Sequence, residues 1–177
     1  MNEGFALAPG PVTASLVVDE FGSTISNSGS SKGLGNQTDL ALLKWFRARS
    51  QVVLTSGKTA EAENYRLPSQ ARLAIFSRTE RTYESLADAK DQVIFLNNLG
   101  SYAQALDALH TAGYQKIHCE FGPTGFIELL WHGRIDGFVS STEADGVERF
   151  AQANHLALKP VQLVGGDLFV AQLLGRG

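Results

Sequence analysis

Residues 51–66 read Gln-Val-Val-Leu-Thr-Ser-Gly-Lys-Thr-Ala-Glu-Ala-Glu-Asn-Tyr-Arg, and this stretch decides the fold. An apolar run, Val52 to Leu54, stops at a small turn that contains Gly57, and a helix-forming segment, Thr59 to Glu63, follows it. Backbone N–H groups at such a strand-to-helix turn point outward, and the helix dipole adds about half a positive charge. The stretch therefore predicts a phosphate-binding turn in an α/β protein.

A plain connection between a strand and a helix is the alternative interpretation of this turn. The sequence Ser-Gly-Lys-Thr at residues 56–59 also resembles part of an NTP-binding P-loop. That motif needs a glycine at position 52, where this chain has Val52. The sequence therefore argues against a P-loop, and the phosphate of a dinucleotide cofactor is the functional interpretation.

Short apolar runs alternate with helical periodicity along the rest of the chain. The first helix is expected to begin at an N-cap, Asn36 or Thr38, and Gly113 is expected to end a later one. Asp39 is interpreted as a favourable charge in the first helical turn. Strands are predicted at Val12–Val18, Val52–Leu54, Leu73–Phe76, Val93–Leu96, Ile117–Cys119, Ile135–Val139, Leu158–Leu163 and Leu168–Leu173, and helices at Thr38–Ala48, Thr59–Glu63, Tyr83–Ala89, Tyr102–Ala112, Phe126–Trp131 and Val147–Ala153.

This order of elements predicts one α/β domain over residues 1–177. The domain is expected to have three layers, α/β/α, around a mainly parallel central sheet. Gly165-Gly166-Asp167 lies between the last two predicted strands and is typical of a hairpin turn, so an antiparallel C-terminal edge is also expected.

The composition excludes several classes of partner. The 177 residues carry 15 basic and 18 acidic side chains, a net charge of -3, without a dense basic stripe, so no nucleic acid is expected. No apolar run is long enough to span a membrane, and no secretory signal is apparent. A single cysteine, Cys119, fits a reducing compartment, and we expect a cytoplasmic protein. The four histidines lack metal-ligand spacing, so no metal is expected.

Four segments also follow the order and spacing of a known family. They are residues 55–66, the stretch from Val18-Asp19 to Gly22, Gly33-Leu34-Gly35 with the predicted helix that ends in Phe46-Arg47-Ala48-Arg49, and Glu120-Phe121-Gly122-Pro123-Thr124. The family is the pyrimidine reductase domain of riboflavin biosynthesis. Residues 55–66 resemble its glycine-threonine loop, and the stretch from Val18 to Gly22 resembles its first strand and the Ser-Leu-Asp-Gly loop that follows. The segment that begins at Gly33 resembles the part before the cofactor loop, and residues 120–124 resemble the motif Glu-Gly-Gly-Pro-Thr. Actinobacterial-type proteins belong to that family, which has the dihydrofolate reductase-like fold.

The resemblance implies an NADPH-dependent reductase that transfers a hydride to a ribosylamino-pyrimidine phosphate or a related pyrimidine- or pterin-like substrate. In such chemistry the protein supplies position and electrostatics, and the nicotinamide carries the hydride. The resemblance also implies a homodimer. It places cofactor contacts at Thr55, Ser56, Gly57, Lys58, Thr59, Ser77, Arg78, Glu120, Phe121, Gly122, Pro123 and Thr124, substrate contacts at Asp19, Glu63 and Arg66, and a catalytic role at Asp19.

These assignments have structural alternatives. Arg78 suits the 2′-phosphate of NADPH because a guanidinium forks two N–H groups toward a phosphate, but an exposed arginine after a strand is common. Pro123 is routine in the first turn of a helix, although a Gly-Pro-Thr-Gly entry also leaves bare amides for a pyrophosphate. Asp19 either lies near the substrate or caps a loop, and Glu63 and Arg66 contact the substrate or solvent. The proton is expected from water, a substrate group or Asp19.

Two departures from the family pattern bear on activity. Glu20 and Phe21 precede the glycine of the first loop, and Phe121 replaces a glycine, where its ring could crowd the cofactor. These departures motivate a second hypothesis, a catalytically inactive nucleotide-binding module of the same fold. A plain α/β domain without any nucleotide is the third.

Overall fold

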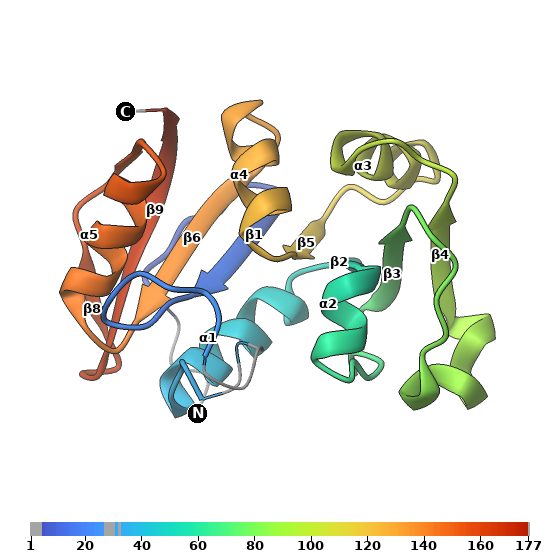
Figure 1. Ribbon diagram of the computed structural model, residues 1–177, viewed down its shortest axis with the longest axis horizontal. Coiled ribbons are helices and arrows are strands. Elements are labelled where there is room, and N and C mark those ends of the chain that lie inside the picture. Colours follow the sequence, from blue (N-terminus) through green and yellow to red (C-terminus); the bar gives the residue numbers. More distant parts are fainter. Residues whose placement is uncertain (1–4, 27–30, 32, 177) are drawn as a thin grey trace.

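The computed structural model describes residues 5–26, 31 and 33–176, and in this part of the chain nine strands form one sheet (Figure 1). Their order is β4-β3-β2-β5-β1-β6-β9-β7, with β8 paired to β9. The strands are β1 (Val12–Val17), β2 (Val52–Ser56), β3 (Arg72–Ser77), β4 (Val93–Asn97), β5 (Ile117–Glu120), β6 (Asp136–Ser141), β7 (Leu156–Leu158), β8 (Gln162–Val164) and β9 (Leu168–Arg176).

The sheet is parallel from β4 to β6 and antiparallel beyond it. β1 pairs with β5 on one side and with β6 on the other, both in parallel. β9 runs antiparallel to β6, β7 and β8. The predicted parallel sheet with an antiparallel C-terminal edge, including the hairpin turn between β8 and β9, is therefore confirmed.

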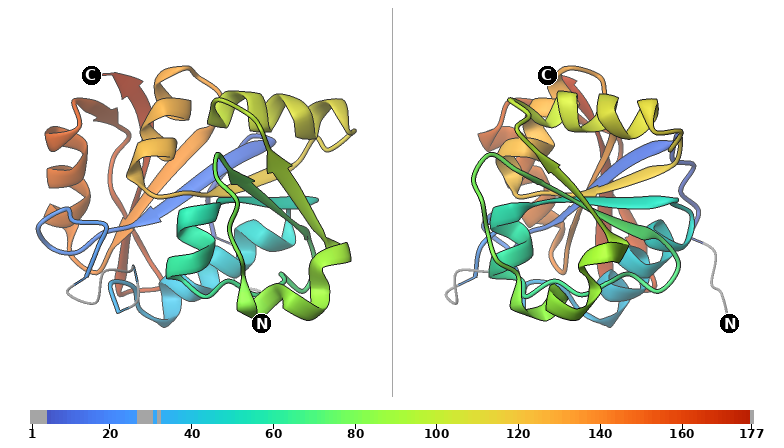
Figure 2. Two further views of the ribbon diagram at one scale, coloured as in Figure 1. Left: turned by 45° about the vertical axis from the view of Figure 1, so that its right-hand side comes forward. Right: turned by 90° about the vertical axis from the view of Figure 1, so that its right-hand side faces the viewer.

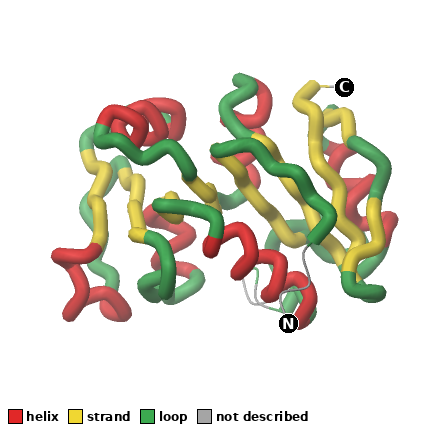
Figure 3. Tube along the Cα trace, turned by 180° about the vertical axis from the view of Figure 1, so that it is seen from behind, coloured by secondary structure: helices red, strands yellow, loops and turns green. Residues whose placement is uncertain are grey.

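Helices cover both faces of the sheet (Figures 2 and 3). The apolar sides of α3, α4 and α5 share one core with the sheet. On the opposite face α2 and η1 pack over β2 and β3, and α1 packs over β6 and β9. The predicted three-layer arrangement is confirmed. The helices are α1 (Gln37–Ala48), α2 (Gly57–Ala62), the 3₁₀ helix η1 (Glu84–Gln92), α3 (Tyr102–Thr111), α4 (Pro123–Trp131) and α5 (Ala144–Ala153).

The helix boundaries follow local side-chain chemistry. Asn36, not Thr38, is the N-cap of α1, because its side-chain oxygen accepts a hydrogen bond from Asp39 N at 2.9 Å. Gly113 follows α3 with φ of +93°, a backbone conformation that glycine adopts without strain. Among the described residues, no helix is long and apolar enough to cross a bilayer.

Two predicted elements are wrong in detail. The short helix predicted at Tyr83–Ala89 is present, but it is a 3₁₀ helix over Glu84–Gln92 with a kink at Ala89. The strand predicted at Leu158–Leu163 is two strands, β7 and β8, each short and each paired with β9. Pro160 lies between them, and proline has no N–H to donate to a ladder.

The topology brings four chain segments to one edge. Parallel strands β1, β2, β5 and β6 end at the same side of the sheet, so the residues after each strand gather there. In open α/β sheets this carboxyl edge is where ligands bind.

Candidate functional site

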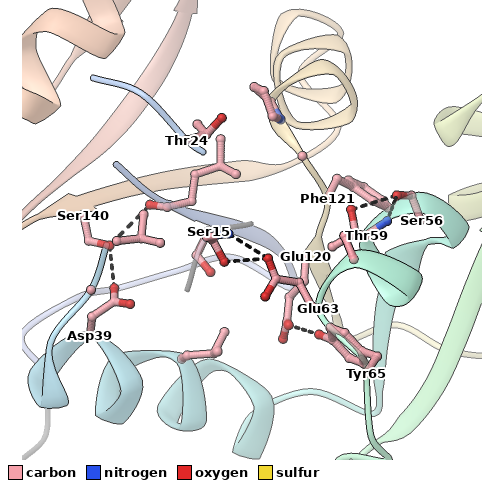
Figure 4. A pocket seen from close by; sticks show the side chains of 18 of the residues that line it. Ser15, Thr24, Asp39, Ser56, Thr59, Glu63, Tyr65, Glu120, Phe121 and Ser140 are labelled. Atoms are coloured by element: carbon pink, nitrogen blue, oxygen red, sulfur yellow. Dashed lines mark hydrogen bonds between the residues drawn. The ribbon is translucent and has the colours of Figure 1, made fainter. Parts of the chain in front are cut away.

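A cavity of about 930 Å³ lies at this edge, between the sheet and α1 (Figure 4). Residues from β1, α1, α2, β5, β6 and the start of α4 line it. The polar or glycine lining residues include Ser15, Gly35, Asp39, Arg47, Ser56, Lys58, Thr59, Glu63, Tyr65, Arg66, Tyr102, Glu120, Gly122, Thr124 and Ser140.

The N-terminus of α4 forms one part of the cavity wall. Gly122, Pro123 and Thr124 line the cavity, and Gly122 is the N-cap. Within the described chain, no side chain caps this nine-residue helix, whereas Ser56 caps α2 through a hydrogen bond from Thr59 N at 3.1 Å. The first amides of α4 therefore keep the capacity to bind an anion.

The turn after β2 lies beside α4. Ser56, Lys58 and Thr59 line the cavity, and Lys58 is exposed. Two predicted residues of this turn serve packing in the structure. Thr55 is fully buried and donates to the backbone oxygen of Glu120 at 2.8 Å, and Gly57 packs against the end of β3.

Gly57 explains why this turn carries a glycine. A Cβ there would lie 2.7 Å from Ser77 Oγ and 2.7 Å from Tyr83 Oη, closer than real Cβ contacts. Ser77 closes the following turn by donating to Thr79 O at 2.6 Å. Arg78 is exposed and is not among the residues that line the cavity. Burial raises the pKa of the lining residue Tyr102, and the charge of Arg78 partly opposes that rise. The 2′-phosphate role of Arg78 stays a prediction.

A buried ion pair forms another part of the wall. Arg47 binds both carboxylate oxygens of Glu120, with Nε to Oε1 and Nη2 to Oε2 both at 2.7 Å. Tyr65 donates its hydroxyl to Glu120 Oε2 and accepts from Arg47 Nη2 at 2.9 Å. Burial raises the pKa of Glu120, and the hydrogen bond and charge of Arg47 oppose that shift. Both oxygens of Glu120 therefore already have protein partners.

A second, partly buried carboxyl lies across the cavity. Asp39, in the first turn of α1, accepts a hydrogen bond from Ser140 Oγ on β6 at 2.6 Å (Figure 4). Burial raises the pKa of Asp39, and the Ser140 hydrogen bond partly opposes that shift. Gly35 makes room for this carboxyl, because a Cβ at position 35 would lie 2.3 Å from Asp39 Oδ2. Asp39 is thus an acidic group of the cavity and not only a favourable charge at the start of a helix.

The predicted substrate residues divide between the cavity and its surroundings. Glu63 and Arg66 line the cavity, and Glu63 Oε1 accepts from Ser31 N at 2.8 Å and from Ser31 Oγ at 2.9 Å. Asp19 does not line it. Its carboxylate accepts from Phe21 N at 2.9 Å and from Ser23 N at 2.7 Å, which is the loop-capping arrangement.

The Phe121 ring packs into the core. Only 3% of Phe121 is exposed, and its ring centroid lies 4.5 Å from that of Tyr102. The expected crowding of the cofactor by this ring has no support in its orientation, although Phe121 does border the cavity. Cys119 is buried and unpaired. No group of three potential metal ligands occurs within residues 5–26, 31 and 33–176.

The sequence interpretation missed the contacts of Arg47 and Tyr65 and the position of Asp39 on the cavity wall. Arg47 and Glu120 are 73 residues apart, and nothing local in the sequence pairs them. The position of Asp39 was easier to predict from the sequence. A carboxyl three residues after an N-cap asparagine lies on the first turn of a helix, at the end of the helix that could border a site.

Several solved structures share this fold. A pyrimidine reductase-like protein from Corynebacterium diphtheriae aligns with a TM-score of 0.64 at 20% identity, over 92% of this chain and 90% of that chain. A diaminohydroxyphosphoribosylaminopyrimidine deaminase/5-amino-6-(5-phosphoribosylamino)uracil reductase from Thermotoga maritima aligns with a TM-score of 0.63 at 16% identity, over 92% of this chain. The chain spans 55% of that protein's length.

Dihydrofolate reductase from Enterococcus faecalis, solved in complex with NADP(H) and RAB-propyl, aligns with a TM-score of 0.56 at 13% identity, over 92% of this chain and 95% of that chain. No family model and no curated protein matches the sequence. At these identities the comparisons define the fold. The chain has the dihydrofolate reductase-like fold that pyrimidine reductases also have.

Proposed function

We propose that the protein is an NADPH-dependent reductase that transfers a hydride to a ribosylamino-pyrimidine phosphate or a related pyrimidine- or pterin-like compound. The observation that carries this proposal is that one cavity extends between two parts of its wall with different chemistry. The cavity joins the uncapped N-terminus of α4, which suits a phosphate, to the partly buried carboxyl of Asp39, which suits a polar heterocycle. The solved structures of the same fold include a pyrimidine reductase-like protein and a reductase in complex with NADP(H).

The chemistry of the α4 end fits a dinucleotide phosphate. Gly122, Pro123 and Thr124 present the start of the helix to the cavity, and the exposed ammonium of Lys58 lies on the neighbouring wall. A Cβ at Gly122 would meet no heavy atom within 4 Å in the described chain, so space remains in front of these amides. We assign these residues to the phosphates of NADPH and Arg78 to its 2′-phosphate.

Asp39 is the residue we assign to proton transfer. Reduction of a sugar imine adds a hydride to the carbon and a proton to the nitrogen, and bound NADPH supplies the hydride. The proton needs a group inside the cavity. Asp39 lines the cavity and has a raised pKa, so a larger fraction of it is protonated near neutral pH than of an ordinary aspartate. Asp19 holds loop amides instead.

Cofactor titration combined with turnover tests the proposal. The purified chain is titrated with NADPH and, separately, with NADH, and is then assayed for NADPH oxidation with 5-amino-6-(5-phosphoribosylamino)uracil. Preferential NADPH binding with turnover supports the reductase. Tight NADPH binding without turnover on any pyrimidine or folate substrate favours the inactive module, and no binding at millimolar NADPH favours a plain α/β domain.

A further inference from the structure

His118, on β5, is a buried titratable residue that the proposed reaction does not use. It is fully buried, and its ring stacks on Phe46 of α1 with centroids 4.8 Å apart and planes within 4°. In the structure its two ring nitrogens face β1, the strand beside β5.

Two hydroxyl groups of β1 bind the two ring nitrogens. Thr13 Oγ1 lies 2.8 Å from Nδ1, and Ser15 Oγ lies 3.2 Å from Nε2. Residues 13 and 15 are two apart on a strand, so their side chains leave the same face of the sheet. Thr13 is buried, whereas Ser15 lines the cavity.

The imidazole is neutral, and therefore carries one N–H. Burial lowers the pKa of His118 to about 3, and the charge of Arg47 acts in the same direction. A neutral imidazole donates from one nitrogen and accepts at the other. Which nitrogen bears the hydrogen decides what Ser15 presents to the cavity.

The surroundings favour the hydrogen on Nε2. Glu120 Oε1 lies 3.8 Å from Nε2, and a carboxylate stabilises an N–H on its side of the ring while repelling a bare lone pair. Thr13 can donate its hydroxyl hydrogen to Nδ1 at 2.8 Å. Nε2–H of His118 then donates to Ser15 Oγ. The hydroxyl hydrogen of Ser15 is therefore not used by the histidine and is available to a ligand in the cavity.

We propose that Ser15 donates a hydrogen bond to the substrate in the cavity and that His118 positions this donor by occupying the acceptor side of the serine. The proposal rests on the proposed function and deepens it, because it names a chemical requirement of the substrate. The atom opposite Ser15 is an acceptor, a carbonyl oxygen or an unprotonated ring nitrogen of the heterocycle. A ring N–H at that position would have only the remaining lone pair of Ser15 Oγ and would leave the serine hydrogen without an acceptor, so it is the weaker partner.

The first test needs no ligand. Nitrogen–proton correlation spectra of the ¹⁵N-labelled protein report which imidazole nitrogen carries the hydrogen. The expected result for His118 is a neutral ring with the hydrogen on Nε2 between pH 6 and 8, a window above its pKa of about 3. A hydrogen on Nδ1 overturns the proposal, because Ser15 then has to donate to the histidine. This result does not depend on whether the protein is a reductase.

The second test separates substrate from cofactor. With NADPH and 5-amino-6-(5-phosphoribosylamino)uracil as probes, Ser15→Ala is expected to raise the KM of the pyrimidine about 3- to 10-fold, the loss of one neutral hydrogen bond. The dissociation constant of NADPH is expected to stay within about 2-fold of the parent value, because Ser15 is expected to contact the pyrimidine and not the cofactor. An unchanged KM, or an equal loss of NADPH affinity, overturns the role of Ser15.

A double-mutant cycle tests the coupling. His118→Gln retains an N–H donor in the side chain, whereas His118→Leu removes it, so only the second is expected to raise the KM of the pyrimidine. In the Ser15→Ala background, His118→Leu is expected to raise the KM no further, because both changes remove the same donor. Additive effects overturn the positioning role. If His118→Leu does not fold, the spectra and Ser15→Ala still decide the proposal, and absence of all turnover overturns the reductase function instead.

Discussion

The guanidinium of Arg47 and the carboxylate of Glu120 form a bidentate ion pair that joins α1 to β5, with both N···O distances at 2.7 Å. Tyr65, which follows α2, completes the contact by bonding to both partners. Three segments that are distant in the sequence are thereby fixed around one wall of the cavity. Because the Glu120 side chain is 10% exposed, its charge depends on Arg47 for compensation.

Removal of Arg47 is expected to destabilise the fold. Arg47→Leu leaves the Glu120 carboxyl buried without its cation, and loss of one partner of a buried pair costs about 3 kcal/mol at the lower end of the usual range. We choose the lower end because the Arg47 side chain is 27% exposed. Urea unfolding of the variant and the parent measures this difference.

The matched control is another arginine ion pair. Arg134 and Asp107 approach within 2.5 Å, and the two arginines are similarly exposed, but the Asp107 side chain is 62% exposed whereas that of Glu120 is 10% exposed. Arg134→Leu is expected to cost less than about 1 kcal/mol. Equal losses of unfolding free energy for the two variants would show that the Arg47–Glu120 pair stabilises the fold no more than the Arg134–Asp107 pair.

His118 predicts a pH dependence of stability. Its folded pKa of about 3 lies below the ordinary value of 6.5, so between these values the unfolded chain binds a proton that the folded chain does not. Stability should therefore fall as the pH falls from 6.5 toward 3, by at most about 1.4 kcal/mol per pH unit from this group. His118→Gln removes the group and should flatten the curve of unfolding free energy against pH. Parallel curves for variant and parent contradict this assignment.

Much of the fold is predictable because its signals are local. Asn36 as a helix cap, Gly113 after a helix and the Gly165-Gly166-Asp167 turn each act within a few residues of where they stand. The cavity edge could also be anticipated, since parallel strands that alternate with helices bring their carboxyl ends together. What local signals do not contain is the pairing of Arg47 with Glu120.

The same distinction separates the two aspartates of the site. Asp19 precedes a glycine in a loop and was assigned a catalytic role by resemblance, yet its carboxylate bonds to the amides of Phe21 and Ser23. Asp39 looked like an ordinary first-turn charge, yet α1 packs across the sheet and turns this carboxyl toward Ser140 and the cavity. The difference lies in tertiary packing, which decides the environment of a carboxyl that local sequence only places on an element.

Two glycines of the cavity edge are expected to respond differently to a methyl group. Gly57→Ala places a Cβ 2.7 Å from Ser77 Oγ and Tyr83 Oη, so we expect a loss of about 1–3 kcal/mol from overpacking. Gly122→Ala meets no heavy atom within 4 Å among the described residues and has φ of -67°, so its melting temperature should match the parent. Thermal unfolding of both variants measures this, and a larger loss for Gly122→Ala contradicts the packing argument.

Asp39→Asn separates charge from shape. The amide still accepts from Ser140, so folding should persist, while loss of the proton donor should lower kcat about 100-fold or more.

The same variant tests the pKa of Asp39 through stability. Because the folded pKa of Asp39 is raised above 3.8, the contribution of the protonated carboxyl to the free energy of unfolding is present below that pH and lost as the pH rises. The variant should therefore be more stable than the parent at neutral pH, and the difference should shrink in acid. If Asp19→Asn lowers kcat and Asp39→Asn does not, the two assignments exchange.

Arg78 is expected to decide the preference for NADPH over NADH. It follows β3 at the carboxyl edge and acts electrostatically on Tyr102, a residue of the cavity wall. A hydrogen bond to a charged group contributes about 1.5–3 kcal/mol, so Arg78→Ala should weaken NADPH roughly 10- to 150-fold and leave NADH nearly unchanged. Fluorescence titration with each cofactor measures the two dissociation constants.

Arg72→Ala is the control for this prediction, because Arg72 begins the same strand at the opposite edge of the sheet and bonds to Tyr114 at 3.3 Å. If Arg78→Ala weakens both cofactors equally, Arg78 does not contact the 2′-phosphate. The selectivity then has to come from another cation at this edge, such as Lys58, which is exposed and lines the cavity.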